Sequence, residues 1–184
     1  MLTWNESKIN ITEKTLTSGG SNLSLISIHS KENTKWPNIC VSMYIPANMT
    51  IQLTKNSLEI LEKERGITNT IKSKINSFIK GLEESHSLKI SLTGVGYNLE
   101  QKNEELLINI GYKNSVKFKI PDNILIKSIE INKNGNYELT AESFDLELLT
   151  QWLHKIRQLK PSYKDKYKGK GFSDVLVDNS QKTV

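Results

Sequence analysis

Two segments of the chain carry apolar residues at the spacing of three and four that marks an amphipathic helix. The first stripe consists of Ile67, Ile71, Ile75, Phe78, Ile79 and Leu82, and the second of Leu146, Leu149, Trp152, Leu153, Ile156 and Leu159. We expect the first helix to start at Gly66 and Thr68, with Thr68 as the cap, and to end near Gly81. For the second helix, Ser143 or Asp145 can serve as the cap, and Pro161 stops it.

Short apolar segments before and between these stripes predict strands. They span residues 23–28, 39–45, 49–53, 58–61, 88–92, 106–110, 116–120, 124–131 and 136–140. Asn134-Gly135 lies between two of them and predicts a hairpin turn, because glycine accepts positive φ without steric cost. Strands therefore precede each predicted helix.

The chain also repeats itself. Ile45-Pro46-Ala47-Asn48 returns as Ile120-Pro121-Asp122-Asn123, and each copy leads into a strand, a Lys-Asn turn, a second strand and an amphipathic helix. This order predicts an α+β fold made by duplication of a small domain, in which a mostly antiparallel β-sheet packs with one α-helix. We expect domains at 1–86 and 87–172, the second with a basic end, followed by a polar tail at 173–184.

Composition narrows the class of protein. The 184 residues have a formal net charge of +5, which leans towards polyanionic partners. No apolar run approaches the roughly 20 residues of a membrane span, and the N-terminus lacks a secretory pattern. The single cysteine, Cys40, cannot form an intramolecular disulfide, and we expect it to be a small buried hydrophobe.

Catalytic signatures are missing from the sequence. His29, His86 and His154 are scattered, and no metalloprotease, α/β-hydrolase or P-loop motif occurs. Gly94-Val95-Gly96 lacks the third glycine of a dinucleotide fingerprint, so we expect a bulge or tight bend in a strand. We predict no enzymatic activity, cofactor, metal, membrane association or small-molecule substrate.

The segment from Lys160 to Phe172 is the strongest candidate for chemistry. It contains Lys160, Lys164, Lys166, Lys168 and Lys170 together with Tyr163 and Tyr167, and Gly169 and Gly171 bracket a lysine. Closely spaced ammonium groups repel unless a polyanion neutralises them, and tyrosine can stack on or hydrogen-bond to RNA. RNA contact is favoured over a solvated basic tail. Lys113, Lys117 and Lys119 form a possible second basic surface, although alternating lysines are equally ordinary on a half-exposed strand.

Four motifs give the chain a family resemblance. They are Leu92-Thr93-Gly94-Val95-Gly96-Tyr97, Leu107-Ile108-Asn109-Ile110-Gly111-Tyr112, Ile120-Pro121 and Tyr167-Lys168-Gly169-Lys170-Gly171. In this order and spacing they resemble the sixth large-subunit ribosomal protein of bacteria and organelles, here the L-six family. The likeness is good from Leu88 to Phe172, fair from Pro46 to Leu82 and poor before that.

The resemblance implies a duplicated domain whose second copy binds large-subunit ribosomal RNA near the docking region of translational GTPases, beside neighbouring ribosomal proteins. It implies that Gly94, Gly96 and Tyr97 are architectural and that Tyr167, Lys168, Gly169, Lys170 and Gly171 contact RNA. Asn114 stands where the family usually has a histidine, three residues after Gly111. With Lys113, Lys160, Lys164 and Lys166, it completes the expected RNA-binding set.

Residue choice bears on the compartment. Ile, Asn and Lys are abundant where other residues would serve the same physics, which is typical of an AT-rich genome. Together with the divergent N-terminal domain, this bias favours a mitochondrial ribosome, with a plastid or the bacterial cytoplasm as the alternative. The leading function is a structural constituent of the large ribosomal subunit. The alternative is an extraribosomal adaptor that uses both domains to bind protein.

Overall fold

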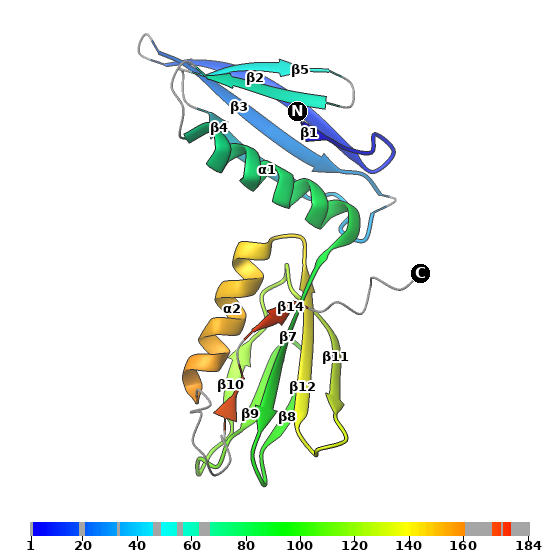
Figure 1. Cartoon of the computed structure of the whole chain (residues 1–184), viewed down its shortest axis with the longest axis vertical. Helices are drawn as coiled ribbons and strands as arrows, with labels where there is room; N and C mark the ends of the chain where they lie inside the picture. Colours follow the sequence, from blue (N-terminus) through cyan, green and yellow to red (C-terminus); the bar gives the residue numbers. More distant parts are fainter. Residues whose placement is uncertain are drawn as a thin grey trace. The chain divides into compact units, whose positions relative to one another are not determined.

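The computed structural model describes residues 2–18, 21–32, 34–45, 49–54, 57–62, 67–160, 171–173 and 175–177. The chain divides into two compact units, Met1–Ser85 and His86–Val184. Each contains one long helix and small antiparallel sheets (Figure 1). The predicted α+β fold with a duplicated domain is confirmed.

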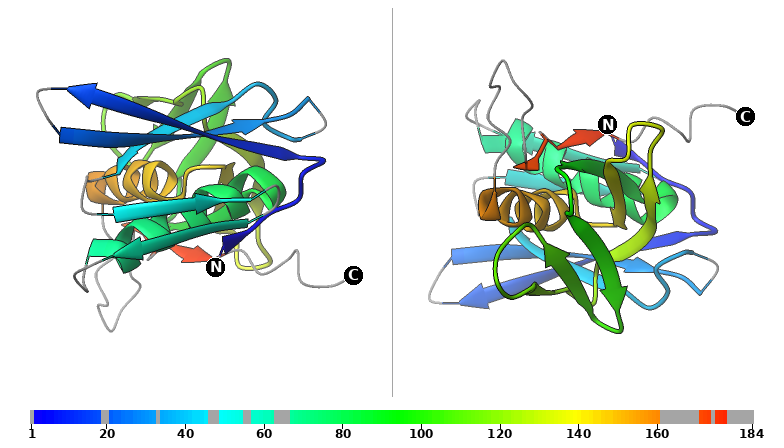
Figure 2. Two further views of the ribbon diagram at one scale, coloured as in Figure 1. Left: turned by 90° about the horizontal axis from the view of Figure 1, so that it is seen from above. Right: turned by 90° about the horizontal axis from the view of Figure 1, so that it is seen from below.

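The first unit contains the strands β1 to β6 and the helix α1. Their bounds are β1 Leu2–Thr3, β2 Ile9–Ser18, β3 Ser21–Ser30, β4 Cys40–Ile45, β5 Met49–Leu53, β6 Ser57–Glu62 and α1 Ile67–Glu84. They form two three-stranded sheets, ordered β1-β6-β5 and β2-β3-β4. The longest pair, β2 and β3, is the pair of dark and lighter blue strands in Figure 2. Its buried side chains include Ile9, Ile11, Ile26 and Ile28.

The second unit contains the strands β7 to β14 and the helix α2. Their bounds are β7 His86–Thr93, β8 Asn98–Lys102, β9 Glu105–Asn109, β10 Val116–Lys119, β11 Leu125–Ile131, β12 Tyr137–Ser143, α2 Leu146–Leu159, β13 Gly171–Phe172 and β14 Leu176–Val177. One sheet is ordered β10-β9-β8; in the other, β11-β12-β7 is extended by β13 and β14, which both pair with β7. The core joins strand residues such as Ile90 and Leu139 to Trp152, Leu153 and Ile156 of α2.

The duplication extends to the order of the strands. The order β11-β12-β7 repeats β5-β6-β1, and β10-β9-β8 repeats β4-β3-β2. The repeated sequence motif falls at the same place in both copies. Ile45 ends β4 and Ile120 directly follows β10, and both side chains are buried. Each unit therefore buries an isoleucine at the equivalent position, just before its next hairpin.

The helix ends settle one open alternative and correct another expectation. Asp145 is the cap of α2, because its Oδ1 accepts from the backbone N of Glu147 at 2.9 Å and of Leu148 at 3.2 Å. For α1 the expected cap and the expected end were wrong, and Gly66 lies outside the described residues. Thr68 lies inside the first turn, and the helix continues past Gly81 to Glu84 because Leu82 still has a buried site to fill.

Cys40 also corrects an expectation, because its side chain is exposed and not buried. Successive residues of a strand point to opposite faces. Ile45 is buried in β4, so Met43 and Val41 share its face, and the register turns Cys40, Ser42 and Tyr44 outwards. The alternation of side chains along the strand therefore decides the exposure of Cys40, and its apolar character does not.

Candidate nucleic-acid interface

A tight turn from Gly94 to Tyr97 joins β7 to β8, as the two glycines predict. The backbone N of Tyr97 donates to the carbonyl of Gly94 at 3.3 Å. Gly96 has φ +77°, which favours glycine. A Cβ on Gly94 would stand 2.3 Å from Cδ2 of Tyr97, so the tyrosine ring lies directly on the glycine backbone. The turn thus needs glycine for two different reasons.

A second loop packs beside the same ring. A Cβ on Gly111 would lie 3.5 Å from Cε1 of Tyr97. The neighbouring Tyr112 is 52% exposed. Its hydroxyl donates to the carbonyl of Leu159 at 3.2 Å, which ties this loop to the end of α2.

Lys160 joins the two loops. Its Nζ donates to the carbonyl of Ile110 at 3.0 Å and lies 4.8 Å from the ring centroid of Tyr97 and 5.7 Å from that of Tyr112. Both distances are within the range in which an ammonium is attracted by the face of an aromatic ring. We call Gly94, Tyr97, Gly111, Tyr112 and Lys160 the aromatic corner.

The chain returns to this place after the basic segment. The backbone N of Phe172 donates to the carbonyl of Lys160 at 2.8 Å, and Gly171 pairs with Thr93 next to the glycine turn. Phe172 is fully buried. Lys160 and Gly171, the two described residues that flank 161–170 in the sequence, therefore both lie beside the aromatic corner.

The predicted RNA-binding residues divide into two sets. Gly94, Gly96, Tyr97, Lys160 and Gly171 come together at the aromatic corner, and Lys113 and Asn114 are exposed just after Tyr112. The other predicted contacts lie outside the described residues; they are Lys164, Lys166, Tyr167, Lys168, Gly169 and Lys170.

The possible second basic surface has mixed charge. Lys117 is exposed, and its Nζ lies 3.9 Å from Oε2 of Glu105 on the neighbouring strand β9. The next residue of β10, Phe118, points to the opposite face of the strand, and its ring centroid lies 6.1 Å from that of Trp152. Exposed lysines alternate with partly buried apolar residues along β10, as predicted, but the charge of Lys117 is accompanied by the opposite charge of Glu105.

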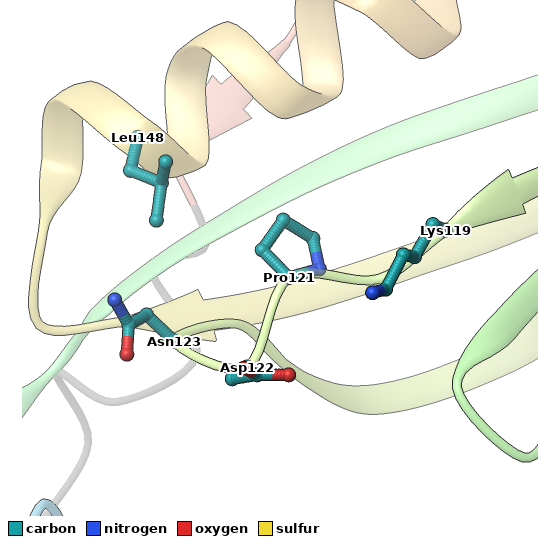
Figure 3. A pocket seen from close by; sticks show the side chains of 5 residues that line it. All are labelled: Lys119, Pro121, Asp122, Asn123 and Leu148. Carbon is teal, nitrogen blue, oxygen red and sulfur yellow. The ribbon is translucent and has the colours of Figure 1, made fainter.

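An open hollow of about 430 Å³ lies at the other end of α2 (Figure 3). It is lined by Lys119, Pro121, Asp122, Asn123 and Leu148. Leu148 is in the first turn of α2 and Lys160 follows the last, and a 14-residue helix is about 20 Å long. The hollow is therefore separate from the aromatic corner.

In the part of the chain that the structure describes, no three His, Cys, Asp or Glu side chains are grouped so that they could hold a metal ion. None of the described helices is long and apolar enough to cross a membrane.

Comparison with known proteins identifies the family. No family model matches the chain. The large ribosomal subunit protein uL6 of Pelobacter propionicus is 31% identical over 133 residues, which cover 72% of this chain and 68% of the relative. The chain belongs to the uL6 family. The uL6 protein of Staphylococcus carnosus is 30% identical over 129 residues, covering 67% and 68%, and uL6c of Pyropia yezoensis is 29% identical over 143 residues, covering 73% and 74%.

Two residues of this uL6 chain, Tyr112 and Phe172, contribute to the site although the sequence did not predict a role for them. Tyr112 belongs to a quoted motif but was given no role, and Phe172 was noted only for its position in the basic segment. A signal for Tyr112 was present, because Gly111-Tyr112 repeats the Gly-Tyr pair of Gly96-Tyr97. That Lys160 contacts the rings of both Tyr97 and Tyr112 could be seen only in the folded structure.

Proposed function

We propose that this uL6 chain is a structural constituent of the large ribosomal subunit that binds large-subunit ribosomal RNA through its second unit. The observation that carries the proposal is the fixing of both ends of the basic segment, at Lys160 and Gly171, beside the aromatic corner. The lysines between these two points are thereby attached to a defined place on a folded domain.

The chemistry of this place suits an RNA backbone. Lysines that neutralise phosphates release counterions, which favours binding. Glycines allow a close approach of backbone to backbone, and double-stranded RNA is read mainly through its shape and its phosphates. Function here consists of affinity and rigidity, with no turnover and no small-molecule substrate.

The position within the subunit is a finer part of the proposal. The relatives are named as large ribosomal subunit proteins. The resemblance further implies neighbouring large-subunit proteins as partners, and a site near the region where translational GTPases dock. Protection of this chain from hydroxyl-radical cleavage when a stalled GTPase is bound to the ribosome would support that site, and unchanged cleavage would contradict it.

The compartment proposed is a mitochondrion. Its support is the abundance of Ile, Asn and Lys and the divergence of the first domain. Two of the relatives named above are uL6 proteins of the bacteria Pelobacter propionicus and Staphylococcus carnosus, and the third is the uL6c protein of Pyropia yezoensis. Recovery of the tagged chain with plastid or bacterial ribosomes would replace the mitochondrial assignment and leave the RNA-binding role intact.

The test is sedimentation of the tagged protein from its source cells through a magnesium-containing gradient. Wild type should run with the large ribosomal subunit, and the Lys168→Glu/Lys170→Glu variant should shift to light fractions. The matched control is Lys72→Glu/Lys80→Glu, which makes the same change of charge on α1 of the first unit and should still run with the subunit.

The opposite results have a clear meaning. Wild type that stays in light fractions at every salt concentration would overturn the ribosomal role and leave an extraribosomal protein-binding adaptor in its place. A Lys168→Glu/Lys170→Glu variant that sediments like wild type would remove the basic segment from the interface.

A further inference from the structure

Lys160 is the one lysine of the basic segment that the structure describes, and its ammonium group is directed into the domain. It is half-buried, its Nζ donates to the carbonyl of Ile110, and the rings of Tyr97 and Tyr112 lie within 4.8 and 5.7 Å. A lysine that binds phosphate places its ammonium in solvent, where the RNA arrives. The surroundings of Lys160 are those of a group that already has its partners.

The backbone of Lys160 is as constrained as its side chain. Its carbonyl accepts the backbone N of Phe172, and the carbonyl of the preceding Leu159 accepts the hydroxyl of Tyr112. Three stretches of chain that are far apart in sequence therefore meet at this residue: the glycine turn, the Gly111-Tyr112 loop and the start of β13. Loss of the ammonium would remove the contact that both loops share at the end of α2, leaving the Tyr112 hydroxyl bond to Leu159 and the packing of Tyr97 on Gly111.

We propose that Lys160 is a positioning residue of the RNA interface and not a phosphate contact. It holds the aromatic corner and the exit of the basic segment in the arrangement that binds RNA. Because the corner is then preorganised, less conformational freedom is lost when RNA binds. The inference rests on the proposed function, since it assigns a role within that RNA site.

Salt dependence separates the two roles. Each phosphate that a lysine neutralises contributes about 0.7 to 0.9 to the slope of log affinity against log salt. A variant that removes a phosphate contact lowers this slope by about one, whereas a variant that disturbs positioning lowers the affinity at every salt concentration and keeps the slope.

The experiment measures filter binding of the full-length protein to deproteinised large-subunit ribosomal RNA from its source cells, over about 50 to 300 mM KCl. Lys160→Met keeps the apolar stem and removes the charge. We expect it to weaken binding roughly threefold to tenfold with an unchanged slope, the loss expected when a few side chains must be ordered on binding. Lys160→Arg keeps a cation over the rings and should bind like wild type.

Two matched variants calibrate the slope. Lys155→Met removes an exposed lysine from the second half of α2 and should change neither affinity nor slope. Lys168→Gln removes a predicted phosphate contact and should lower the slope by about one. Thermal unfolding of each variant, measured alongside, shows that it is folded at the assay temperature.

A second variant keeps the test decisive if Lys160→Met does not fold. Tyr112→Leu removes a half-exposed ring and leaves the lysine in place. If Lys160 acts through the rings, this variant should weaken binding with an unchanged slope, and its effect should not add to that of Lys160→Met.

The contradicting results are distinct. A slope lowered by about one in Lys160→Met would make Lys160 a phosphate contact, and unchanged affinity in folded Lys160→Met and Tyr112→Leu would limit the corner to a structural role. Either result overturns the inference while the proposed function stands. Wild type that fails to bind the RNA would overturn both.

Discussion

In both units the turn after the first strand is held by the end of the helix, but the helix end is acidic in the first unit and basic in the second. In the first unit the turn between β1 and β2 is held by the end of α1: the backbone N of Asn5 donates to Oε1 of Glu83 at 2.8 Å, and Nζ of Lys8 donates to the carbonyl of Glu83 at 3.2 Å. In the second unit the turn between β7 and β8 is held by Lys160 at the end of α2. Where one helix ends in Glu83-Glu84, the other leads into lysines.

This difference shows what the fold requires and what it leaves open. Both copies have a tie between the first turn and the end of the helix. In the first unit Lys8 donates to the carbonyl of Glu83, and in the second the ammonium of Lys160 lies over the ring of Tyr97. The acidic end of α1 would repel a phosphate backbone, and the basic end of the second unit attracts it. The comparison therefore supports the proposal that the second unit is the one that binds RNA. Four substitutions, from the largest expected effect to the smallest, test the packing of the two units and, at Gly94 and Glu83, their RNA affinity.

The largest effect is expected from Phe172. This residue anchors β13, a strand with no counterpart in the described residues of the first unit. Its side chain is fully buried against the core. Phe172→Ala should destabilise the second unit by about 3 to 5 kcal/mol, because it removes a large core side chain and leaves a cavity. Urea unfolding measures the loss. Leu176→Ala, at a site 59% exposed, is the control and should cost less than about 0.5 kcal/mol.

The next effect concerns the glycine turn. Gly94→Ala places a methyl group where the Tyr97 ring now lies, so the ring must move and the variant should lose about 1 to 3 kcal/mol of stability. It should also weaken RNA binding, since the aromatic corner moves with the ring. Gly135→Ala has open space around the new methyl and a φ of +74°, so it should cost about 1 kcal/mol and leave RNA binding unchanged. Equal RNA affinities for the two variants would separate the turn from the interface.

A smaller effect is expected in the first unit. Glu83→Ala removes the acceptor for the backbone N of Asn5 and should cost up to about 1 kcal/mol, reduced by relief of an acidic charge at a helix C-terminus. RNA affinity should not fall. The neighbouring Glu84→Ala serves as the control for charge, and a fall in RNA affinity in Glu83→Ala would show that the first corner also contributes to binding.

The smallest effect is a dependence of stability on acid. Glu138 of β12 forms an ion pair with Lys89 of β7, and Nδ2 of Asn132 donates to it at 3.0 Å. The hydrogen bond from Lys89, followed by that from Asn132, lowers the pKa of Glu138 below its ordinary value of 4.5. A depressed folded pKa means that the stabilisation is present above the unfolded pKa and is lost as pH falls through the folded one.

Melting temperatures measured from about pH 6 down to about pH 3 check this linkage. Glu138→Gln should lower stability by less than about 1 kcal/mol near neutral pH and should converge with wild type in acid. Glu130→Gln, exposed on β11, should follow the wild-type profile. A constant gap between Glu138→Gln and wild type at every pH would show that the ion pair has no part in the acid dependence.

Periodicity predicted the helices well, because both have a continuous apolar face that the core requires. Their ends depended on single contacts, and Thr68 was misjudged for that reason. Strand β2 was missed, since its segment is mostly polar with only Ile9 and Ile11 buried near its start. Strand β8 was missed because Leu99 alone is buried in it.

The candidate site was predictable in its parts and not in its assembly. Gly94, Tyr97, Lys160 and Gly171 each carried a local signal, namely a turn, a motif or a charge. Their meeting depends on the pairing of β13 with β7 and on the end of α2 lying over the second loop. The inward direction of the Lys160 ammonium runs against the ordinary expectation that a lysine beside other lysines faces the anion.

The central claim is that RNA contacts the second unit at the aromatic corner and not the equivalent corner of the first. Ultraviolet cross-linking of intact ribosomes, followed by mass spectrometry of this chain, tests it most directly. Cross-linked peptides should contain Tyr112 or residues 160–172, and peptides from 2–8 and 83–85 should be free of nucleotide. Cross-links confined to the first unit would contradict the claim.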